Sequence, residues 1–246
     1  VFIMILLAGF WQIQKSIKKE IELSQSQNNF MLSVTHELKT PLTSIQLALQ
    51  TLSSRKLSPE QMQSLIDKAI SENDRLKVLI DNIIHASSIE SKGISADKSD
   101  IDLKIIVENI IAKSNKRLEK NLVNLDCQKP IKLFADTFMI ETSIINIIEN
   151  AIKYAGTHQI EVEIKKTQSH CLISISDMGP GIDEKEQPYI FDKFYRIGNE
   201  ETRIKKGSGL GLYIAKQFIK LHNGDIYYKK NNPCGSIFTI SLPYER

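Results

Sequence analysis

Two long stretches near the start of the chain carry apolar residues at alternating spacings of three and four. At this spacing, apolar side chains form one stripe along an α-helix, so each stretch is predicted to be an amphipathic helix. The first stripe comprises Met31, Val34, Leu38, Leu42, Ile45, Leu49 and Leu52, and the second comprises Met62, Leu65, Ile66, Ala69, Ile70, Leu76, Leu79, Ile80, Ile83 and Ile84. Between them, Ser58 suits an N-cap, Pro59 suits the first helical position and Gln61 can complete a capping box. The pattern therefore predicts a helical hairpin.

A single hairpin cannot form an enclosed core, because two packed helices leave part of each apolar stripe exposed to water. Pairing with a second copy of the chain would bury both stripes in a four-helix bundle. We therefore expect residues 28–92 to form a dimerisation domain. A polar segment with Gly and Ser, GISADKSD, follows at about 93–100 and is predicted to be a linker.

From residue 101 to residue 246 the pattern mixes helical segments with short β-like segments. Helices are expected at about 102–119, 138–154 and 210–222, and strands at about 123–127, 131–135, 160–166, 171–177, 225–230 and 236–242. A polar, glycine-containing stretch runs from 178 to 208, and Asn231, Asn232 and Pro233 form the turn of the last hairpin. This mixture predicts an α+β two-layer sandwich, with helices on one face of a mixed sheet.

The first ten residues, VFIMILLAGF, carry no charge and are followed by Trp11 and then by Lys15, Lys18 and Lys19. A membrane span needs about 20 apolar residues, so this run can only be the end of one, in a chain that does not begin with Met. Aromatic and then basic residues are typical of a span that emerges on the cytoplasmic side. The alternatives are a buried helix start or the remnant of a signal peptide, but a signal peptide would carry its basic residues before the apolar run.

We therefore expect residues 1–11 to be the end of a transmembrane helix and residues 12–27 to be a helical signalling linker. The chain would be anchored in the inner membrane, with its catalytic region in the cytoplasm.

The composition is that of a folded globular protein, with 41% hydrophobic and 25% charged residues, which argues against a disordered chain. The 32 basic and 29 acidic residues leave a net charge of +3, which gives no reason to expect a nucleic-acid partner. Cys127, Cys171 and Cys234 are scattered and lack metal-ligand spacing. They fit a reducing compartment and exclude a disulfide framework.

One histidine on the first helix lies away from the apolar stripe. His36 points about 165° from the centre of the stripe, so it should face solvent, with Thr40 on the same face and Glu37 beside it. A neutral imidazole can act as a nucleophile, and a neighbouring carboxylate can take up its proton. A surface histidine is often inert. However, Pro41 follows within the helix at a cost of about 3 kcal/mol, which needs a reason.

Residues 30–46, FMLSVTHELKTPLTSIQ, resemble the phosphoacceptor box of bacterial sensor histidine kinases. HELKTPL at 36–42 is close to that family's usual H-E-L-[KR]-T-P-L. The resemblance implies that His36 is phosphorylated and that Glu37 is its acid–base partner. It also implies that Thr40 positions water for dephosphorylation of the partner protein.

Two motifs in the second half offer polar groups at defined positions. Asn146, Asn150 and Lys153 share one face of an expected helix, where an amide oxygen suits a hard cation and an ammonium suits phosphate; a solvated polar face is the alternative. The sequence DMGPGI, residues 177–182, follows an apolar strand. Its Asp177 can accept a hydrogen bond from an exocyclic amine, and its glycines allow close approach to a ring, although a plain turn is also possible.

Two further motifs are rich in glycine or in aromatic residues. GSGLGL, residues 207–212, leads into a helix whose free N–H groups suit phosphate, although its spacing matches neither a Walker loop nor a Rossmann loop. IFDKFYR, residues 190–196, places aromatic residues in a loop. Such a loop can dock on a ligand, or it can simply be anchored by its two phenylalanines.

Together these motifs resemble the N, G1, F and G2 boxes of the same family, in the family's order, and the resemblance covers about residues 28–246. It implies a GHKL-type ATPase domain that uses ATP and Mg²⁺, with Asn150 as the metal ligand. The remaining implied nucleotide-binding residues are Asn146, Lys153, Tyr154, Asp177, Gly179, Gly181, Arg196, Gly207, Gly209, Leu210 and Gly211. The segment 183–206 would be the ATP lid. Met178 and Ala155 depart from the family's usual residues, but neither is assigned to the chemistry.

The resemblance implies a homodimeric, ATP-dependent protein-histidine kinase of a two-component system. It would phosphorylate His36, pass the phosphoryl group to an aspartate of a response regulator, and also dephosphorylate that regulator. A mainly phosphatase role is compatible with the same residues. One alternative is an ATP-driven conformational machine of the wider GHKL class, which leaves HELKTPL unexplained. Another is a membrane-anchored scaffold with a dead nucleotide site, which leaves the intact Asn150, Asp177 and glycines unexplained.

Overall fold

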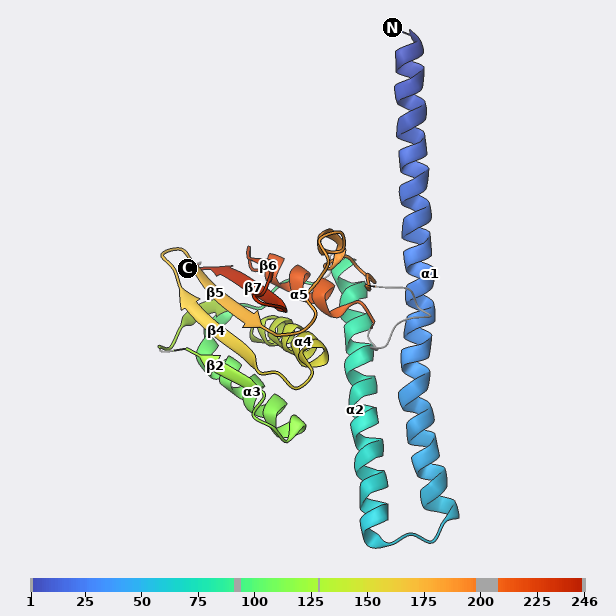
Figure 1. The fold of residues 1–246 in the computed structure, drawn as a ribbon, viewed down its shortest axis with the longest axis vertical. Helices are drawn as coiled ribbons and strands as arrows, with labels where there is room; N and C mark the ends of the chain where they lie inside the picture. Colours follow the sequence, from blue (N-terminus) through green and yellow to red (C-terminus); the bar gives the residue numbers. More distant parts are fainter. Residues whose placement is uncertain (1, 91–93, 128, 198–207, 245–246) are drawn as a thin grey trace. The chain divides into compact units, whose positions relative to one another are not determined.

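The structure of the chain is a computed structural model that describes residues 2–90, 94–127, 129–197 and 208–244 (Figure 1). It divides into two compact units, a helical unit that ends at Asp81 and an α/β unit that begins at Asn82. The predicted order of a helical hairpin followed by a two-layer sandwich with a mixed sheet is confirmed.

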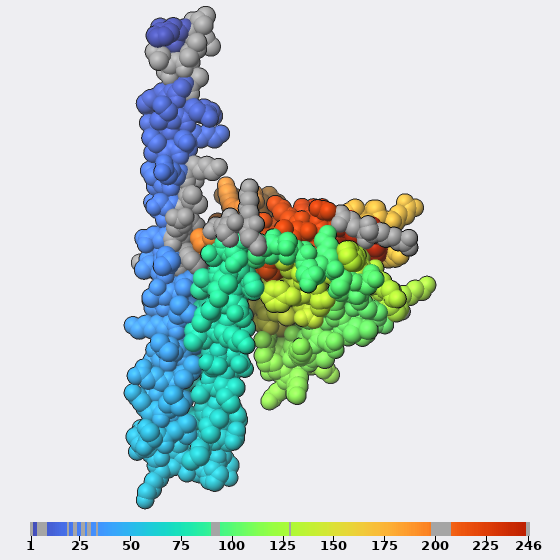
Figure 2. Space-filling view, turned by 180° about the vertical axis from the view of Figure 1, so that it is seen from behind, coloured from blue at the N-terminus to red at the C-terminus, as the bar shows by residue number. Residues whose placement is uncertain are grey.

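The helical unit is a hairpin of α1 (Phe2–Ser54) and most of α2 (Pro59–Glu90), which lie side by side (Figures 1 and 2). The last turns of α2, from Asn82, belong to the α/β unit. α1 runs for 53 residues and continues through Pro41. The predicted capping box is present at the start of α2. The Ser58 N–H donates to Gln61 Oε1 at 3.1 Å, and the Gln61 N–H donates to Ser58 Oγ at 3.3 Å. Each bond satisfies a backbone donor that the first turn of a helix leaves free.

The hairpin buries only part of its two apolar stripes. Val34, Ala48 and Leu79 are buried. Many large apolar side chains of the stripes stay exposed, namely Met31, Leu42, Leu49, Met62, Ile66, Ile70, Ile80 and Ile84. In the described part of the chain, no helix carries an apolar stretch long enough to cross a membrane.

The α/β unit is built on a five-stranded sheet in the order β2-β4-β5-β7-β6, in which only β2 and β4 pair in parallel. The strands are β2 (Val123–Asp126), β4 (Ile160–Lys166), β5 (His170–Ser176), β6 (Asp225–Lys230) and β7 (Ser236–Pro243). The helices of the unit are α3 (Leu103–Leu118), α4 (Thr137–Ala155) and α5 (Gly211–Lys220), and a short 3₁₀ turn, η1, spans Gln187–Tyr189.

The helices cover one face of this sheet, as Figure 1 shows for α4 and α5. Alternate residues of β4 and β5 are buried, including Val162 opposite Ile175 and Ile164 opposite Ile173. On the helix side, the fully buried core includes Ile140, Ile144, Ile147, Ile148, Ile214, Phe218 and Ile219. Each such side chain contributes on the order of 2 kcal/mol relative to leaving it in water. Because the apolar positions of α4 face the sheet, the polar positions of that helix face away from it.

One strand was not indicated by the sequence pattern. β1 (Ser99–Asp102) begins within the segment expected to be a linker and pairs antiparallel with β3 (Lys132–Ala135), outside the main sheet. Its sequence, SDID, has no run of β-formers, so the pairing with β3 determines its conformation. Of the expected linker, residues 94–98 are described and carry no regular structure.

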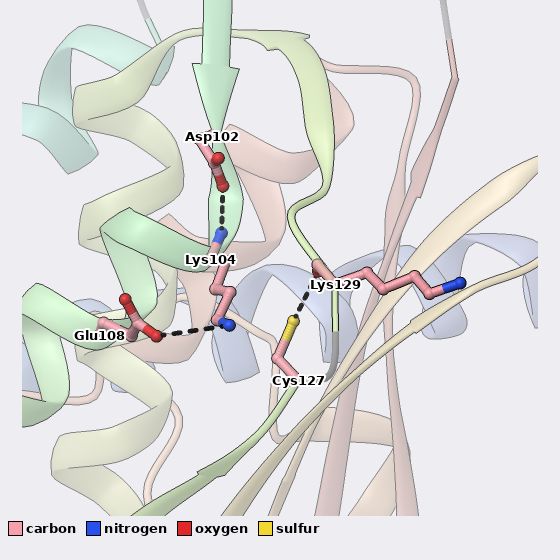
Figure 3. A network of polar contacts seen from close by, with 5 residues as sticks. All are labelled: Asp102, Lys104, Glu108, Cys127 and Lys129. Carbon is pink, nitrogen blue, oxygen red and sulfur yellow. Dashed lines mark hydrogen bonds and ion pairs between the residues drawn. The ribbon is translucent and has the colours of Figure 1, made fainter.

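The end of β1 is also the start of α3. Asp102 has extended backbone angles, and its Oδ1 accepts a hydrogen bond from the Lys104 N–H at 3.0 Å (Figure 3). The Lys104 ammonium lies 3.8 Å from Glu108 Oε1, and the Cys127 thiol donates to the carbonyl oxygen of Lys129 at 3.2 Å. Figure 3 draws both contacts. The N-cap therefore turns the chain from strand into helix within one residue.

A buried histidine ties the end of α5 to the start of α4. The Asp136 N–H donates to His222 Nε2 at 2.9 Å, so Nδ1 carries the proton and donates to the Phe218 carbonyl at 2.8 Å. Asp136 is in turn the N-cap of α4, accepting from the Met139 N–H at 3.1 Å. His222 thus helps to place the helix that carries Asn146 and Asn150.

Replacing His222 with alanine should lower the free energy of unfolding by about 2–4 kcal/mol, because it leaves a cavity and an unpaired Asp136 N–H. Urea unfolding followed by circular dichroism would measure the loss. The exposed His158 offers a matched control, and His158→Ala should change the value by less than about 0.5 kcal/mol. Equal losses for the two variants would contradict the bridging role of His222.

Candidate functional site

The first candidate site lies on α1 in the helical unit. His36 is exposed, as its helical position predicts, whereas Glu37 and Thr40 are half-buried and Pro41 is buried. The Thr40 hydroxyl donates to the His36 carbonyl oxygen at 3.0 Å. Pro41 has no N–H to donate to the Glu37 carbonyl one turn earlier. The imidazole is therefore presented to solvent on a continuous helix.

The carboxyl group of Glu37 is available as an acceptor. Its Oε1 is buried and has no hydrogen-bond partner in the part of the chain that the structure describes. A carboxylate next to an imidazole in sequence can receive a proton that the ring gives up. The arrangement suits nucleophilic chemistry at His36.

The second candidate site lies in the α/β unit and begins on α4. Asn146, Asn150 and Lys153 are half-buried, and the Lys153 ammonium lies 5.1 Å from the centroid of the Tyr154 ring. Asn146 Nδ2 is buried and, among the described residues, has no hydrogen-bond partner. A Cβ on Gly211, the first residue of α5, would lie 3.0 Å from Asn146 Oδ1. The polar face of α4 therefore meets the start of α5.

Asp177 lies at the end of a strand of the sheet in the same unit. It directly follows β5 and is 3% exposed, and its Oδ1 accepts from the Gly179 N–H at 2.7 Å. Burial raises the pKa of this carboxyl, and hydrogen bonds from the Gly179 N–H and from Ser236 oppose the shift. A buried carboxyl of this kind is a directed acceptor for a ligand amine.

Two glycines allow the backbone to pack tightly around Asp177. A Cβ on Gly179 would lie 2.9 Å from Asp177 Oδ1 and 3.0 Å from the Tyr154 carbonyl oxygen. A Cβ on Gly235 would lie 2.0 Å from the Asp177 carbonyl oxygen, and its φ of +110° is in the region that favours glycine. Side chains at these positions would displace the strand end that holds the carboxyl.

Two residues at the β6–β7 turn contact Asp177, although no sequence motif indicated that they belong to the site. The Asn231 amide donates to the Asp177 carbonyl oxygen at 2.9 Å, and the Ser236 hydroxyl hydrogen-bonds the Asp177 carboxylate. The turn was predicted, but the register that brings it to Asp177, with Ser176 opposite Ile237, comes only from strand pairing. In the sequence, the only feature that could have indicated this contact was the pair Gly235 and Ser236 at the start of β7.

The remaining predicted residues lie in the glycine-rich and aromatic motifs. Gly209 has a φ of +71°, Leu210 is fully buried and Gly211 begins α5, whereas Gly207 lies outside the described residues. Arg196 is half-buried, and the Gly181 φ is +73°. Of the expected lid, residues 183–197 are described, and there the Tyr195 hydroxyl donates to the Glu186 carboxylate.

The donor set of this second site fits a nucleotide with its metal ion. The unpaired amide of Asn146 can donate to a phosphate oxygen. An amide oxygen, such as that of Asn150, is a group that can bind a hard cation. In the described residues, no cluster of three or more His, Cys, Asp or Glu side chains is placed to hold a metal ion. A magnesium ion here would therefore take oxygens from the nucleotide as well as from the protein.

Two family models match the two units. The model of the His Kinase A (phospho-acceptor) domain matches residues 26–92, and that of the histidine kinase-, DNA gyrase B- and HSP90-like ATPase matches residues 135–246.

Curated relatives agree with both models. The sensor-like histidine kinase SenX3 of Mycolicibacterium smegmatis is 27% identical over 225 residues, covering 90% of this chain and 58% of that protein. The sensor protein RprX of Bacteroides fragilis is 29% identical over 252 residues, covering 99% and 48%. The chain thus spans about half the length of these relatives.

Solved structures share the fold. The Acinetobacter baumannii histidine kinase AdeS matches with a TM-score of 0.61 and 25% identity, covering 86% of this chain and 98% of that chain. The histidine kinase ThkA, solved in complex with the response regulator protein TrrA, matches in fold with a TM-score of 0.60 and 20% identity, covering 93% and 65%. This chain belongs to the sensor histidine kinases of two-component systems.

Replacing Asp177 with asparagine should abolish most nucleotide binding without weakening the fold. The Gly179 N–H requires the amide oxygen, so the amide NH₂ would face the amine of the base, donor against donor. We expect ADP affinity to fall at least about 100-fold. Calorimetric titration with ADP and Mg²⁺ would measure it.

The pH dependence of stability provides a second measurement on the same variant. Because burial raises the folded-state pKa above the ordinary 3.8, the stability that this carboxyl contributes is fully present below pH 3.8 and is lost as pH rises through the folded pKa. The asparagine variant lacks this loss. Its Tm relative to the unmodified chain should therefore rise as the pH is raised above 3.8. A constant Tm difference would contradict the raised pKa.

Proposed function

We propose that this chain is the kinase core of a sensor histidine kinase that moves the γ-phosphoryl group of ATP first to His36 and then to an aspartate of a response regulator. The observation that carries the proposal is the exposed His36 beside an unpaired Glu37 carboxyl oxygen. The other unit of the chain offers hydrogen-bonding groups suited to a nucleotide, namely the buried Asp177 carboxyl and the Asn146 amide.

In the second unit, the Asp177 carboxylate accepts a hydrogen bond from the adenine amine, and the glycines beside it allow the base to approach the backbone. Asn146 and Lys153 bind phosphate oxygens, together with Tyr154, Arg196 and the motif 207–211. Asn150 holds the metal ion. A bound Mg²⁺ neutralises the charge that develops on the phosphate oxygens.

In the first unit, one ring nitrogen of His36 attacks the γ-phosphorus with its lone pair. The new P–N bond forms as the P–O bond to the β-phosphate breaks, and ADP leaves. The proton of the other ring nitrogen passes to the Glu37 carboxylate, which leaves the phosphoimidazole neutral at the ring. Positioning of the two reacting groups supplies most of the rate enhancement.

The transfer to the response regulator and the formation of a dimer are both assigned to the helical unit. The solved complex of ThkA with the response regulator protein TrrA supports a response regulator as the partner that receives the phosphoryl group. The exposed apolar stripes of α1 and α2 support a four-helix bundle formed with a second copy of the chain.

A phosphatase activity toward the regulator is proposed on the position of Thr40. Its hydroxyl lies one helical turn from His36 and keeps lone pairs that can accept from a water molecule. Loss of label from a phosphorylated receiver domain should be slower with Thr40→Ala than with the unmodified chain. Equal rates would refute the role.

Anchoring in the inner membrane is proposed on the start of α1, which would leave the catalytic region in the cytoplasm. Phe2, Ile3, Phe10 and Trp11 are exposed, and the Lys15 ammonium lies 5.1 Å from the centroid of the Trp11 ring. Apolar, aromatic and basic residues in this order suit the boundary of a bilayer. Flotation with phospholipid vesicles, lost when residues 1–11 are removed, would support anchoring, and a chain that never floats would refute it.

Incubation of the chain in detergent micelles with Mg²⁺ and γ-labelled ATP should label His36. The label should be acid-labile and alkali-stable, and His36→Gln should carry none, because the glutamine amide is not a nucleophile. Glu37→Gln should lower the labelling rate at least about 100-fold. The neighbouring exposed Lys39 provides a control, since Lys39→Ala should label within about threefold of the unmodified chain.

Two other results would redirect the function. Tight ADP binding without any label would favour a conformational ATPase or a phosphatase-dominant protein. Neither label nor nucleotide binding would favour a scaffold.

A further inference from the structure

A lysine on α5 that no sequence motif singled out makes four contacts at once. The Lys216 ammonium lies 2.5 Å from Asp225 Oδ1 and donates to the Ile226 carbonyl oxygen at 2.7 Å. It also lies 4.8 Å from the ring centroid of Phe191 and 5.8 Å from that of Tyr227. Both ring distances are within the range of a cation–π contact.

This cluster is too enclosed to be an ordinary surface ion pair. The Lys216 side chain is 17% exposed and that of Asp225 is 37% exposed. Partial removal of water strengthens both the ion pair and the attraction of the ammonium to an aromatic face. The contacts therefore restrain Phe191 as well as joining α5 to β6.

Phe191 is linked by further contacts to the loop that follows Asp177. Its ring packs edge-on against Phe238 of β7 at 6.3 Å, and Phe238 packs against Tyr228 of β6 at 5.4 Å. The Tyr228 hydroxyl accepts a hydrogen bond from the Ile182 N–H at 2.9 Å. Ile182 ends the motif DMGPGI, so a continuous line of contacts runs from Lys216 to the loop that follows Asp177.

The position of Lys216 on its helix adds a second connection. α5 begins at Gly211, the glycine that lies against Asn146 of α4. Lys216 lies five positions further along the same helix, about 7.5 Å along its axis. A group that holds α5 on β6 thus also holds the helix end that faces the polar residues of α4.

We propose that Lys216 is a positioning residue for nucleotide binding. Its ammonium holds Phe191 of the motif IFDKFYR against the sheet, and through Phe238 and Tyr228 it supports the loop from Asp177 to Ile182. Lys216 does not touch the nucleotide. The inference rests on the proposed nucleotide site and adds a residue outside the motifs that define it.

The test is calorimetric titration of the 246-residue chain with ADP and Mg²⁺, beside a thermal melt of each variant. Lys216→Met keeps the length of the side chain and removes its charge, and it should raise the Kd for ADP roughly five- to tenfold. Lys216→Arg keeps the charge and can still lie over an aromatic ring, so it should restore most of the affinity. Lys220→Met removes an exposed lysine from the same helix and should leave the Kd within about twofold.

A double-mutant cycle distinguishes positioning of Phe191 from a purely structural ion pair. Phe191→Leu removes the ring that Lys216 contacts, and the double variant with Lys216→Met should bind ADP about as weakly as the worse single variant. Asp225→Asn weakens the ion pair but leaves the ring contact, so it should lower the Tm with a smaller effect on the Kd.

Three results would overturn the proposal. They are an unchanged Kd in Lys216→Met, fully additive effects of Lys216→Met and Phe191→Leu, or equal loss of affinity in Asp225→Asn and Lys216→Met. An unmodified chain that binds no ADP would instead count against the nucleotide site itself, which separates the failure of the proposed function from the failure of this inference.

Discussion

The pairing of β5 with β7 is the constraint on which the nucleotide-binding unit depends. It brings Ser236 and the β6–β7 turn beside Asp177, where the Asp177 N–H donates to the Ser236 carbonyl oxygen at 2.9 Å and the Asn231 amide holds the Asp177 carbonyl oxygen. A carboxyl that is 3% exposed is unfavourable unless its oxygens are paired, and here a loop N–H and a hydroxyl pair them. The same hydrogen bonds fix the orientation of the Asp177 carboxyl.

The two units meet opposite physical demands. Asp177 is buried at the end of β5 and Asn146 is half-buried on α4, in a unit whose sheet and helices share a continuous apolar core. Such a rigid setting suits selective binding of a ligand. His36 is exposed on a long helix, where another molecule can reach its imidazole. Separate units allow one residue to remain accessible while the other site stays enclosed.

Much of the fold was predictable because its elements have strong periodic patterns. The hairpin, α4 and the strands β4 and β6 match their predicted ranges closely, since apolar periodicity and caps such as Ser58 and Asp136 act locally. β1 was not predictable, because three of its four residues are polar and the segment becomes a strand only when β3 lies beside it. The contacts of Ser236 and Asn231 with Asp177 were not predictable for the same reason, since Asp177 is distant from them in sequence. The contacts of Lys216 depend on how α5 packs against β6 and Phe191.

The sequence alone was enough to identify three chemical features: an imidazole next to a carboxylate on a solvent-facing helix position, two amides four residues apart with a lysine three residues further on, and glycines around an aspartate. These features depend on residue identity and on the fixed spacing of one helix or one turn. The tertiary structure decided which groups became paired, buried or raised in pKa, as Asp177 shows. Burial and hydrogen bonding depend on strands and helices that meet in space, and only long-range packing brings them together.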